Sequence, residues 1–287
     1  MGNETAPKST SAGQRLRLAM ASHERVLPFI GVYDVFSASV AGRHFDSLFV
    51  SGFGFAASNY GLPDIGFVTW TDILAFVQRL RTVLPAHNLL VDIDDGYCDP
   101  DVACHVVSVL ESAGASGVVL EDQKRPRRCG HFEGKQIMEL DEYLAKLRMV
   151  LATRRDLVVV ARTDTADQDD MVRRVKAFAE AGADAVLIDG LPTLDIVRRL
   201  SKEVDRPFCF NQIAGGKSPP CTLGELHDAG VKMAIYSTPC LFSAQAAIEN
   251  AMADLQARDG TLAGNTIGVR DCNRVLTDNL ERRDSRP

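Results

Sequence analysis

The sequence predicts one α/β domain, a (β/α)8 TIM-type barrel. Eight short apolar runs alternate with helical stretches along most of the 287 residues, at a spacing that suits right-handed β-α-β crossovers. Polar residues follow the ends of these runs, and barrels of this class carry their active sites at the carboxyl ends of the strands. An open doubly wound sheet is the alternative, but no Gly-x-Gly-x-x-Gly motif opens a helix after the first run.

The order of the elements follows from the periodicity of the apolar residues. Short runs of leucine and β-branched residues, bounded by polar ones, are typical of strands that are covered on both faces. They predict strands at residues 26–32, 47–50, 89–91, 117–120, 157–161, 185–188, 207–210 and 233–235. Amphipathic stretches predict helices at residues 14–23, 35–42, 70–83, 101–113, 140–153, 171–181, 194–204, 222–229 and 241–255.

Three parts of the chain differ in composition. Residues 1–13 are polar, with almost nothing to bury, and we expect a disordered tail there. Residues 14–240 hold the alternating pattern and are expected to form the barrel. Residues 241–287 comprise a C-terminal helix and a charged, weakly apolar tail, which we expect to lie at the periphery or to contact another subunit.

Composition and charge exclude several classes of protein. The net charge is −6 and no basic stripe is present, which argues against nucleic-acid binding. No apolar run approaches the roughly twenty residues that span a bilayer, so we expect no membrane contact. The seven cysteines form no Cys-x-x-Cys pair, and the sequence shows no secretory signal. We therefore expect a cytoplasmic protein in a reducing compartment.

Two neighbouring strands end in clusters of acids. Residues 89–91 lead into Asp92 and Asp94, and residues 117–120 lead into Glu121. Carboxylates at buried strand ends carry a large cost of desolvation and repulsion unless a positive charge lies between them. Because oxygen is the only ligand atom offered, Mg²⁺ or Mn²⁺ suits this cluster better than zinc does.

Further polar segments follow other strands. Residues 51–58 are small and are expected to form a loop whose amides approach an anion, with a plain flexible connection as the alternative. Asp64 lies on a later loop, either as a site residue or as a turn former. Residues 123–135 are dense in cations, with a proline and two glycines, and are expected to be a mobile loop.

Five motifs resemble those of the isocitrate lyase and phosphoenolpyruvate mutase superfamily. They stand in the family's order across about residues 25–255 and are SGFGFAASNYGLPD, VDIDDGY, LEDQKRPRRCGHFEGK, ARTD and NQIAGGKSP. The resemblance implies a modified barrel whose last helix is exchanged with a neighbouring subunit, in homodimers or homotetramers. It also implies Mg²⁺, a reaction through a pyruvate-type enolate, and a small substrate, either an oxo or hydroxy acid or a phosphoryl pyruvate, with two or three anionic groups.

The resemblance assigns the acids and one arginine to specific roles. Asp92 matches the carboxylate that binds Mg²⁺ directly, whereas Asp94 and Glu121 match those that hold the ion partly through water. Arg162 matches the arginine that grips a substrate carboxylate, because a planar guanidinium forms two parallel bonds to such a group. Pairing of Arg162 with Glu121 or Asp164 for structure alone is the alternative.

The same resemblance supplies the substrate-binding candidates. The segment that begins at Ser51 matches one that gives hydroxyl and amide donors to the oxo-acid end of the substrate, and Asn211 matches a polar ligand opposite it. Asp189 stands where many of these lyases have a longer glutamate. Aromatic residues near the pocket make an apolar substituent conceivable, with core packing as the alternative. The candidates are Ser51, Gly52, Phe53, Gly130, Asp189 and Asn211.

Cys129 is the residue that discriminates between reactions. In the lyases that this chain resembles, the cysteine of the CGH segment passes a proton to an enolate carbon. Because Arg127, Arg128 and His131 flank the thiol, its pKa is expected to be depressed. A buried, inert cysteine is the alternative. The catalytic candidates are Cys129, His131, Arg162 and Asp64.

The leading hypothesis is a Mg²⁺-dependent carbon–carbon lyase that splits a substituted 2-hydroxy diacid, malate-like or citramalate-like, into two acids. Ala214 stands where methylisocitrate lyases have a glutamate, so neither methylisocitrate nor isocitrate is proposed as the substrate.

A phosphonomutase of natural-product metabolism is the second hypothesis. Carboxyphosphonoenolpyruvate mutases have segments similar to PRRCGHFEGK and GGKSP, although this chain lacks the Asn-Ser pair of phosphoenolpyruvate mutases proper. A catalytically silent barrel that serves as a scaffold is the third hypothesis, and the intact acid cluster and Arg162 argue against it.

Overall fold

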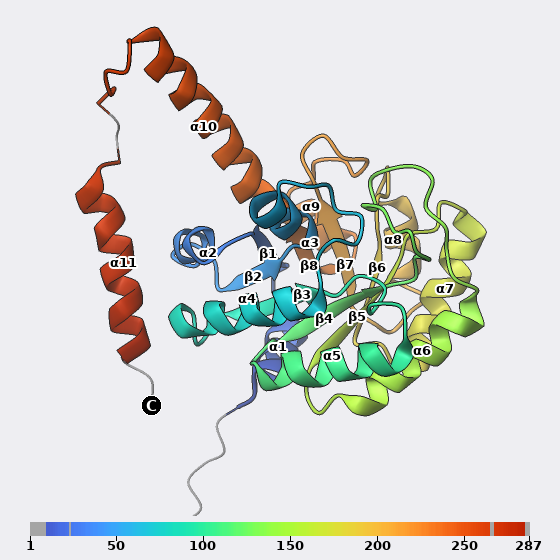
Figure 1. The fold of residues 1–287 in the computed structure, drawn as a ribbon. Helices are drawn as coiled ribbons and strands as arrows, with labels where there is room; N and C mark the ends of the chain where they lie inside the picture. Colours follow the sequence, from blue (N-terminus) through green and yellow to red (C-terminus); the bar gives the residue numbers. More distant parts are fainter. Residues whose placement is uncertain (1–9, 23, 265–266, 285–287) are drawn as a thin grey trace, which may run out of the picture.

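The computed structural model describes residues 10–22, 24–264 and 267–284. Its centre is a closed barrel of eight parallel strands that follow one another in chain order (Figure 1). The first and last strands pair directly, with Leu27 opposite Met233. The predicted (β/α)8 barrel is therefore confirmed.

Strands and helices alternate around the barrel. The strands are β1 (Leu27–Val32), β2 (Ser47–Val50), β3 (Asn88–Asp92), β4 (Gly117–Glu121), β5 (Val158–Thr163), β6 (Ala185–Ile188), β7 (Phe208–Gln212) and β8 (Val231–Tyr236). The helices up to β8 are α1 (Ala12–Ala21), α2 (Val35–Ala41), α3 (Gly52–Phe55), the π-helical turn η1 (Ala56–Tyr60), α4 (Trp70–Val83), α5 (Pro100–Ser112), α6 (Leu140–Thr153), α7 (Gln168–Ala181), α8 (Asp195–Leu200) and α9 (Leu223–Asp228). After β8 come α10 (Pro239–Ala257) and α11 (Val269–Asp284).

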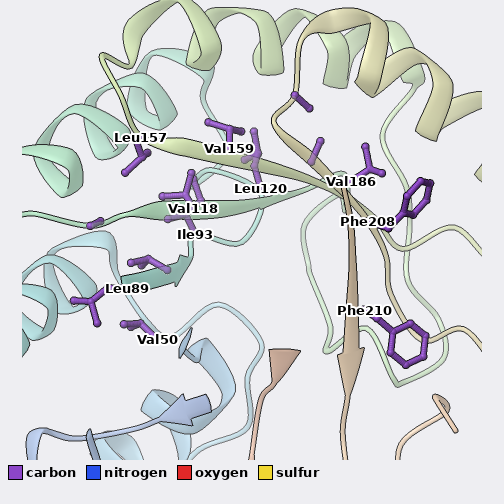
Figure 2. Packing of buried hydrophobic residues seen from close by; sticks show 14 of the residues in the cluster. Val50, Leu89, Ile93, Val118, Leu120, Leu157, Val159, Val186, Phe208 and Phe210 are labelled. Carbon is purple, nitrogen blue, oxygen red and sulfur yellow. The ribbon is translucent and has the colours of Figure 1, made fainter. Parts of the chain in front are cut away.

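The core has two layers because successive side chains of a strand point to opposite faces. Along β4, Val118 and Leu120 pack outward among helix residues, whereas Val119 belongs to the cluster inside the barrel. Figure 2 shows part of the outer layer, with Val118 and Leu120 near Val159 of the next strand. Helix α1 adds Leu16 and Met20 to the inner cluster.

Helix α1 begins at Ala12, ahead of the predicted start at Gln14. Ser11 caps it, since its side chain accepts from the Gln14 amide and the Gln14 side chain accepts from the Ser11 amide. The predicted disordered tail, residues 1–13, is thus wrong at its C-terminal end. Residues 1–9 lie outside the described residues.

The segment after β2 is helical, which corrects the predicted loop at residues 51–58. Ser51 Oγ accepts from the Gly54 amide at 3.1 Å and caps α3, which continues into η1. The turn ends at Gly61, whose φ of 63° favours a glycine. Small residues therefore serve here to let a short helix follow the strand closely.

The C-terminal region holds a second helix that the sequence reasoning did not predict. Figure 1 shows α10 projecting away from the barrel and α11 running back toward α2 and α4. Asn279 of α11 donates to Ser39 Oγ at 2.8 Å, and Arg43 forms an ion pair with Asp278. None of the side chains of α10 is buried in the described structure. Exchange of a helix with a neighbouring subunit remains a prediction.

Among the described helices, none combines the length and the apolar composition that crossing a membrane requires.

Candidate active site

A pocket opens at the carboxyl ends of the strands and gathers most of the predicted site. Nine predicted residues line it, namely Ser51, Phe53, Asp64, Asp92, Cys129, Gly130, Arg162, Asp189 and Asn211. His131 lines an adjacent hollow instead. The sequence reasoning did not place Arg127, Leu187, Ile213, Ile235 and Ser237 in the lining. Strand periodicity could have found two of them, because Leu187 and Ile235 lie two residues before a polar strand end and so share its face.

The acids after β3 sit on a strained turn. Asp94, Tyr97 and Cys98 have φ values of 52°, 62° and 77°, in the left-handed region that side chains rarely adopt. The Asp95 carboxylate holds the turn by accepting from the amides of Tyr97 and Cys98, each at 3.2 Å. It also accepts two bonds from Arg125, at 2.9 and 3.0 Å. Strain that is held in this way fixes the direction in which Asp94 points.

In this structure the side chain of an arginine supplies the positive charge between the acids. Arg127, whose side chain is 1% exposed, contacts Asp64 at 2.6 Å, Glu121 at 2.9 Å and Asp94 at 3.0 Å. Asp64 is therefore a pocket residue paired to a cation, and its proposed role as a turn former has no support here. Arg127 was expected only as a neighbour of Cys129, because sequence spacing does not show that its side chain turns back toward β3 and β4.

The residues around Asp92 fit a hard divalent cation. The position that a Cβ of Gly52 would occupy lies 3.5 Å from Asp92 Oδ2, 3.6 Å from Asp94 Oδ1 and 3.9 Å from Asp64 Oδ1, so three carboxylates converge beside this glycine. Asp92 is buried and has no ion pair within the described residues, and Glu121 Oε2 is buried without a hydrogen bond there. Burial raises the pKa of Asp92, and it raises the pKa of Glu121 to about 7.

These carboxylates are not arranged as a set of metal ligands in the described structure. In the part of the chain that the structure describes, no three His, Cys, Asp or Glu side chains form a ready metal cluster. A divalent ion held here would keep several waters, as Mg²⁺ commonly does. Asp92 is the carboxylate free to bind it directly, whereas Arg127 holds the others.

Arg162 lies at the centre of a charged network. Its Nε and Nη2 contact Asp164 at 2.8 and 3.0 Å, and Nη2 also lies 2.8 Å from Asp189 Oδ2 and 3.3 Å from Glu121 Oε2. Asn211 donates to Asp189 at 2.9 Å. The charge of Arg162 holds the pKa of Asp189 well below its usual range, despite burial. Among these contacts within the described chain, none uses Nη1.

The cation-rich segment predicted at residues 123–135 is docked over the pocket. Its base is closed by the antiparallel bridge between Gln123 and Ile137, and Lys135 Nζ lies 3.3 Å from Asp164. Gly130 rests directly on the charged network, because a Cβ there would lie 1.9 Å from Asp189 Oδ2 and 2.6 Å from Arg162 Nη2. No other residue type could approach so closely.

His131 docks onto the loop after β7. Its Nδ1 accepts from the Lys217 amide at 2.9 Å, and its Nε2 lies 3.6 Å from Asp189 Oδ1. A Cβ on Gly216 would lie 2.5 Å from His131 Nδ1, so this glycine makes room for the ring. His131 therefore fastens the segment to the barrel.

The predicted depression of the Cys129 pKa is wrong. The pKa of the thiol is raised to about 11, chiefly by burial; the Asp189 and Asp64 carboxylates also raise it, whereas the His131 amide and Arg162 lower it. The guanidinium of Arg127 is engaged by three carboxylates, so its charge is compensated before it can favour a thiolate. The thiol therefore stays protonated near neutral pH.

The closed segment leaves little room inside. The central pocket holds only about 30 Å³, which suits a water molecule and not a diacid. A diacid therefore has to displace the segment when it binds, and the segment would re-dock less deeply over the bound molecule.

Comparison with known proteins agrees with this architecture. A family model described as phosphoenolpyruvate phosphomutase matches residues 17–256. The chain is 34% identical over 250 residues to a 2-methylisocitrate lyase of Halalkalibacterium halodurans, a match that covers 85% of this chain and 82% of the relative.

Solved structures are similar over nearly the whole chain. A 2,3-dimethylmalate lyase has a TM-score of 0.89 at 29% identity, covering 94% of both chains. An oxaloacetate acetylhydrolase bound to 3,3-difluorooxalacetate has a TM-score of 0.89 at 29% identity, covering 95% of this chain and 96% of that one. A phosphonopyruvate hydrolase in complex with oxalate and Mg²⁺ has a TM-score of 0.81 at 25% identity, covering 95% and 97%.

Proposed function

The chain belongs to the phosphoenolpyruvate mutase and isocitrate lyase superfamily, and from that membership we propose that it is a Mg²⁺-dependent carbon–carbon lyase. Its substrate is a small 2-hydroxy diacid with a malate-like or citramalate-like skeleton. The similar proteins include lyases that are named for 2-methylisocitrate and 2,3-dimethylmalate. The similar phosphonopyruvate hydrolase, solved with Mg²⁺, supports the choice of ion.

The observation that carries this proposal is the protonated thiol of Cys129 in the same pocket as Arg162 and Asp92. Cleavage breaks the bond between C2 and C3 of the substrate. The 2-hydroxyl loses its proton to the acid cluster, where Asp64 is the candidate acceptor, and C2 becomes the oxo carbon of one product. The bonding electron pair stays on C3 as the enolate of the second acid, and that carbon needs a proton. A thiol that remains protonated at neutral pH can supply it.

Each remaining residue has a definite task in this scheme. Arg162 holds one substrate carboxylate through its outward nitrogen, while Asp189 and Asn211 keep its guanidinium in place. Bound beside Asp92, Mg²⁺ would polarise the oxygen on C2 and hold the neighbouring carboxylate. The docked segment excludes water, which would otherwise protonate the enolate without control.

The test is to incubate the protein and Mg²⁺ with a panel of 2-hydroxy diacids and to measure the 2-oxo acid that is released. Cys129→Ser should lose turnover by about 10²- to 10⁴-fold while the substrate still binds in calorimetry. Cys104→Ser, a half-buried cysteine on α5, is the matched control and should retain activity. Equal turnover in both variants would remove Cys129 from the mechanism.

A phosphomutase is the second candidate, and the family model itself favours it. The same arginine and acid cluster would then stabilise a phosphoryl group in transit. Phosphorus NMR with phosphoenolpyruvate or phosphonopyruvate separates the two, since conversion of one of these compounds into the other appears only for a mutase and a lyase alone leaves both spectra unchanged.

We also propose that the protein is a homodimer or homotetramer in which the helix α10 covers a neighbouring barrel. This helix exposes Ile248 by 61% and Met252 by 56%, and none of its own residues is fully buried in the single described chain. Light scattering should show an oligomer for the natural chain. The double change Ile248→Asp and Met252→Asp should shift it toward the monomer, whereas an unchanged mass would reject the role of this face.

A further inference from the structure

A buried cation lies behind the acid cluster, outside the lining of the central pocket. Lys146 of α6 is only 3% exposed, and its ammonium donates to the Asp95 carbonyl oxygen at 2.8 Å. Burial lowers the pKa of Lys146, although the Asp95 carboxylate acts in the other direction. Taking an ammonium out of water has a cost, and none of the proposed chemical steps uses this one. The bond to the Asp95 carbonyl is what offsets this cost.

The carbonyl that Lys146 contacts belongs to the strained turn after β3. In the same turn the Asp94 carbonyl accepts from the Glu121 amide at 2.9 Å. Three successive carbonyls, those of Ile93, Asp94 and Asp95, each have a donor. Asp94 adopts a φ of 52°, so its backbone would relax if these bonds were removed. Lys146 therefore helps to hold the backbone from which the Asp94 carboxylate projects.

Two cations hold this turn from different parts of the chain. Arg125 contacts the Asp95 carboxylate at 2.9 and 3.0 Å, but it belongs to the cation-rich segment, which a diacid has to displace when it binds. Lys146 belongs to α6, which begins after that segment has ended. Tyr143 of the same helix donates to the Leu120 carbonyl of β4 at 2.7 Å and ties α6 to the barrel. The hold of Lys146 on the turn is therefore independent of the position of the segment.

A lysine suits this task better than an apolar side chain would. A charged donor makes a stronger bond to a carbonyl than a neutral one, and the four-carbon stem lets the ammonium reach the turn from a helix. A methionine would fill nearly the same space. It would leave the buried Asp95 carbonyl without a donor, since no other hydrogen bond reaches this oxygen in the described structure. The loss would fall on the turn and not on the packing of α6.

We propose that Lys146 is a positioning residue, which keeps the Asp94 carboxylate beside Asp92 while the segment is displaced. It touches neither the substrate nor the ion and acts through the turn alone. The inference rests on the proposed Mg²⁺-dependent function. It adds a residue that keeps the acid cluster arranged for the ion when Arg125 and Arg127 have moved away with the segment.

The experiment measures Mn²⁺ binding to the substrate-free protein by calorimetry. Lys146→Met should raise the Kd by roughly tenfold or more, as replacement of a residue that orients a metal ligand commonly does. Lys176→Met is the matched control, because it makes the same change on α7, in an exposed pair with Glu203, and should leave the Kd unchanged. A natural Kd in Lys146→Met would overturn the inference.

A second background separates positioning from a purely structural role. If Lys146 acts through Asp94, adding Lys146→Met to Asp94→Asn should raise the Kd by less than about twofold beyond Asp94→Asn alone, because both changes remove one interaction. A full further tenfold rise would overturn the inference. A purely structural role predicts a lower midpoint of urea unfolding in Lys146→Met together with a natural Kd in the folded protein, and that result would overturn it as well.

Lys146→Gln takes the place of Lys146→Met if the latter does not fold. Its amide ends one bond short of the ammonium and cannot reach the Asp95 carbonyl, so the Kd should again rise. A natural Kd in this variant would overturn the inference.

The outcome for the proposed function is read separately, from cleavage of 2-hydroxy diacids by the natural chain at saturating Mn²⁺. A natural chain that binds Mn²⁺ and cleaves no diacid would reject the lyase, while the Kd series would still decide the role of Lys146. A natural chain that binds no Mn²⁺ would reject the ion dependence and this inference together.

Discussion

Replacement of Gly130 by alanine tests whether the docked segment is the working state of the site. The new Cβ would lie 1.9 Å from Asp189 Oδ2, 2.5 Å from Asp164 Oδ1 and 2.6 Å from Arg162 Nη2. Ion pairs join Arg162 to both Asp164 and Asp189, so none of these atoms can move aside without breaking a pair. The segment therefore has to lift, and it carries Cys129 with it.

The expected loss follows from that displacement. A shift of about 1 Å in a catalytic group costs on the order of 10²-fold, and loss of the general acid costs about 10²- to 10⁴-fold. We expect kcat to fall by about 10²- to 10³-fold in Gly130→Ala. The unfolding free energy should also fall, because a lifted segment takes Arg127 out of its buried ion pairs with Asp64, Asp94 and Glu121.

The assay combines steady-state kinetics with limited trypsin digestion, which cuts after Arg127 and Arg128 when the segment is lifted. Oxalate and Mg²⁺ should protect the natural chain and should fail to protect Gly130→Ala. Gly224→Ala is the control, since its Cβ would meet nothing closer than Thr222 Oγ1 at 3.8 Å. Natural kcat together with natural protection in Gly130→Ala would refute this account of the docked segment.

Three further outcomes are expected. With the pKa of Cys129 raised to about 11, its thiol remains a proton donor below that value, so the cleavage rate should fall only as the pH nears 11; a fall centred on the ordinary thiol pKa of about 8.5 would contradict this. Arg174→Met leaves Asp122 buried without its partner at 3.1 Å and should lower the unfolding free energy in urea by about 3–5 kcal/mol, whereas Arg173→Met, which breaks an exposed pair, should leave it nearly unchanged. Asp92→Asn should weaken Mn²⁺ binding in calorimetry by roughly tenfold or more, and Asp101→Asn, at an exposed helix start, should leave it unchanged.

Local pattern was enough to predict the barrel. Each strand of a (β/α)8 fold is covered on both faces, so it appears as a continuous apolar run, and β3 and β4 were found in this way. The strand ends then placed Asp92, Arg162 and Asp189 in one pocket, since parallel strands finish at the same rim.

What escaped prediction depends on contacts between distant residues. The thiol of Cys129 was judged by its charged neighbours in sequence, but its pKa is set first by burial, which sequence does not show. Helix α11 is charged over most of its surface, and its ordering depends on contacts such as Asn279 with Ser39. The caps of α1 and α3 lie at serines that could equally have been loop residues.

The contacts of Arg127 with the acid cluster affect how the chain folds before any metal ion binds. The chain can fold without a bound metal ion, because the guanidinium of Arg127 already gives three buried carboxylates a counter-charge. Treatment with a chelator should accordingly abolish the proposed activity without lowering the melting temperature of the protein. The same arginine travels with the segment that admits substrate, so lifting that segment leaves the acids uncompensated until an ion arrives. In the proposed enzyme, binding of the ion and opening of the segment would both depend on Arg127.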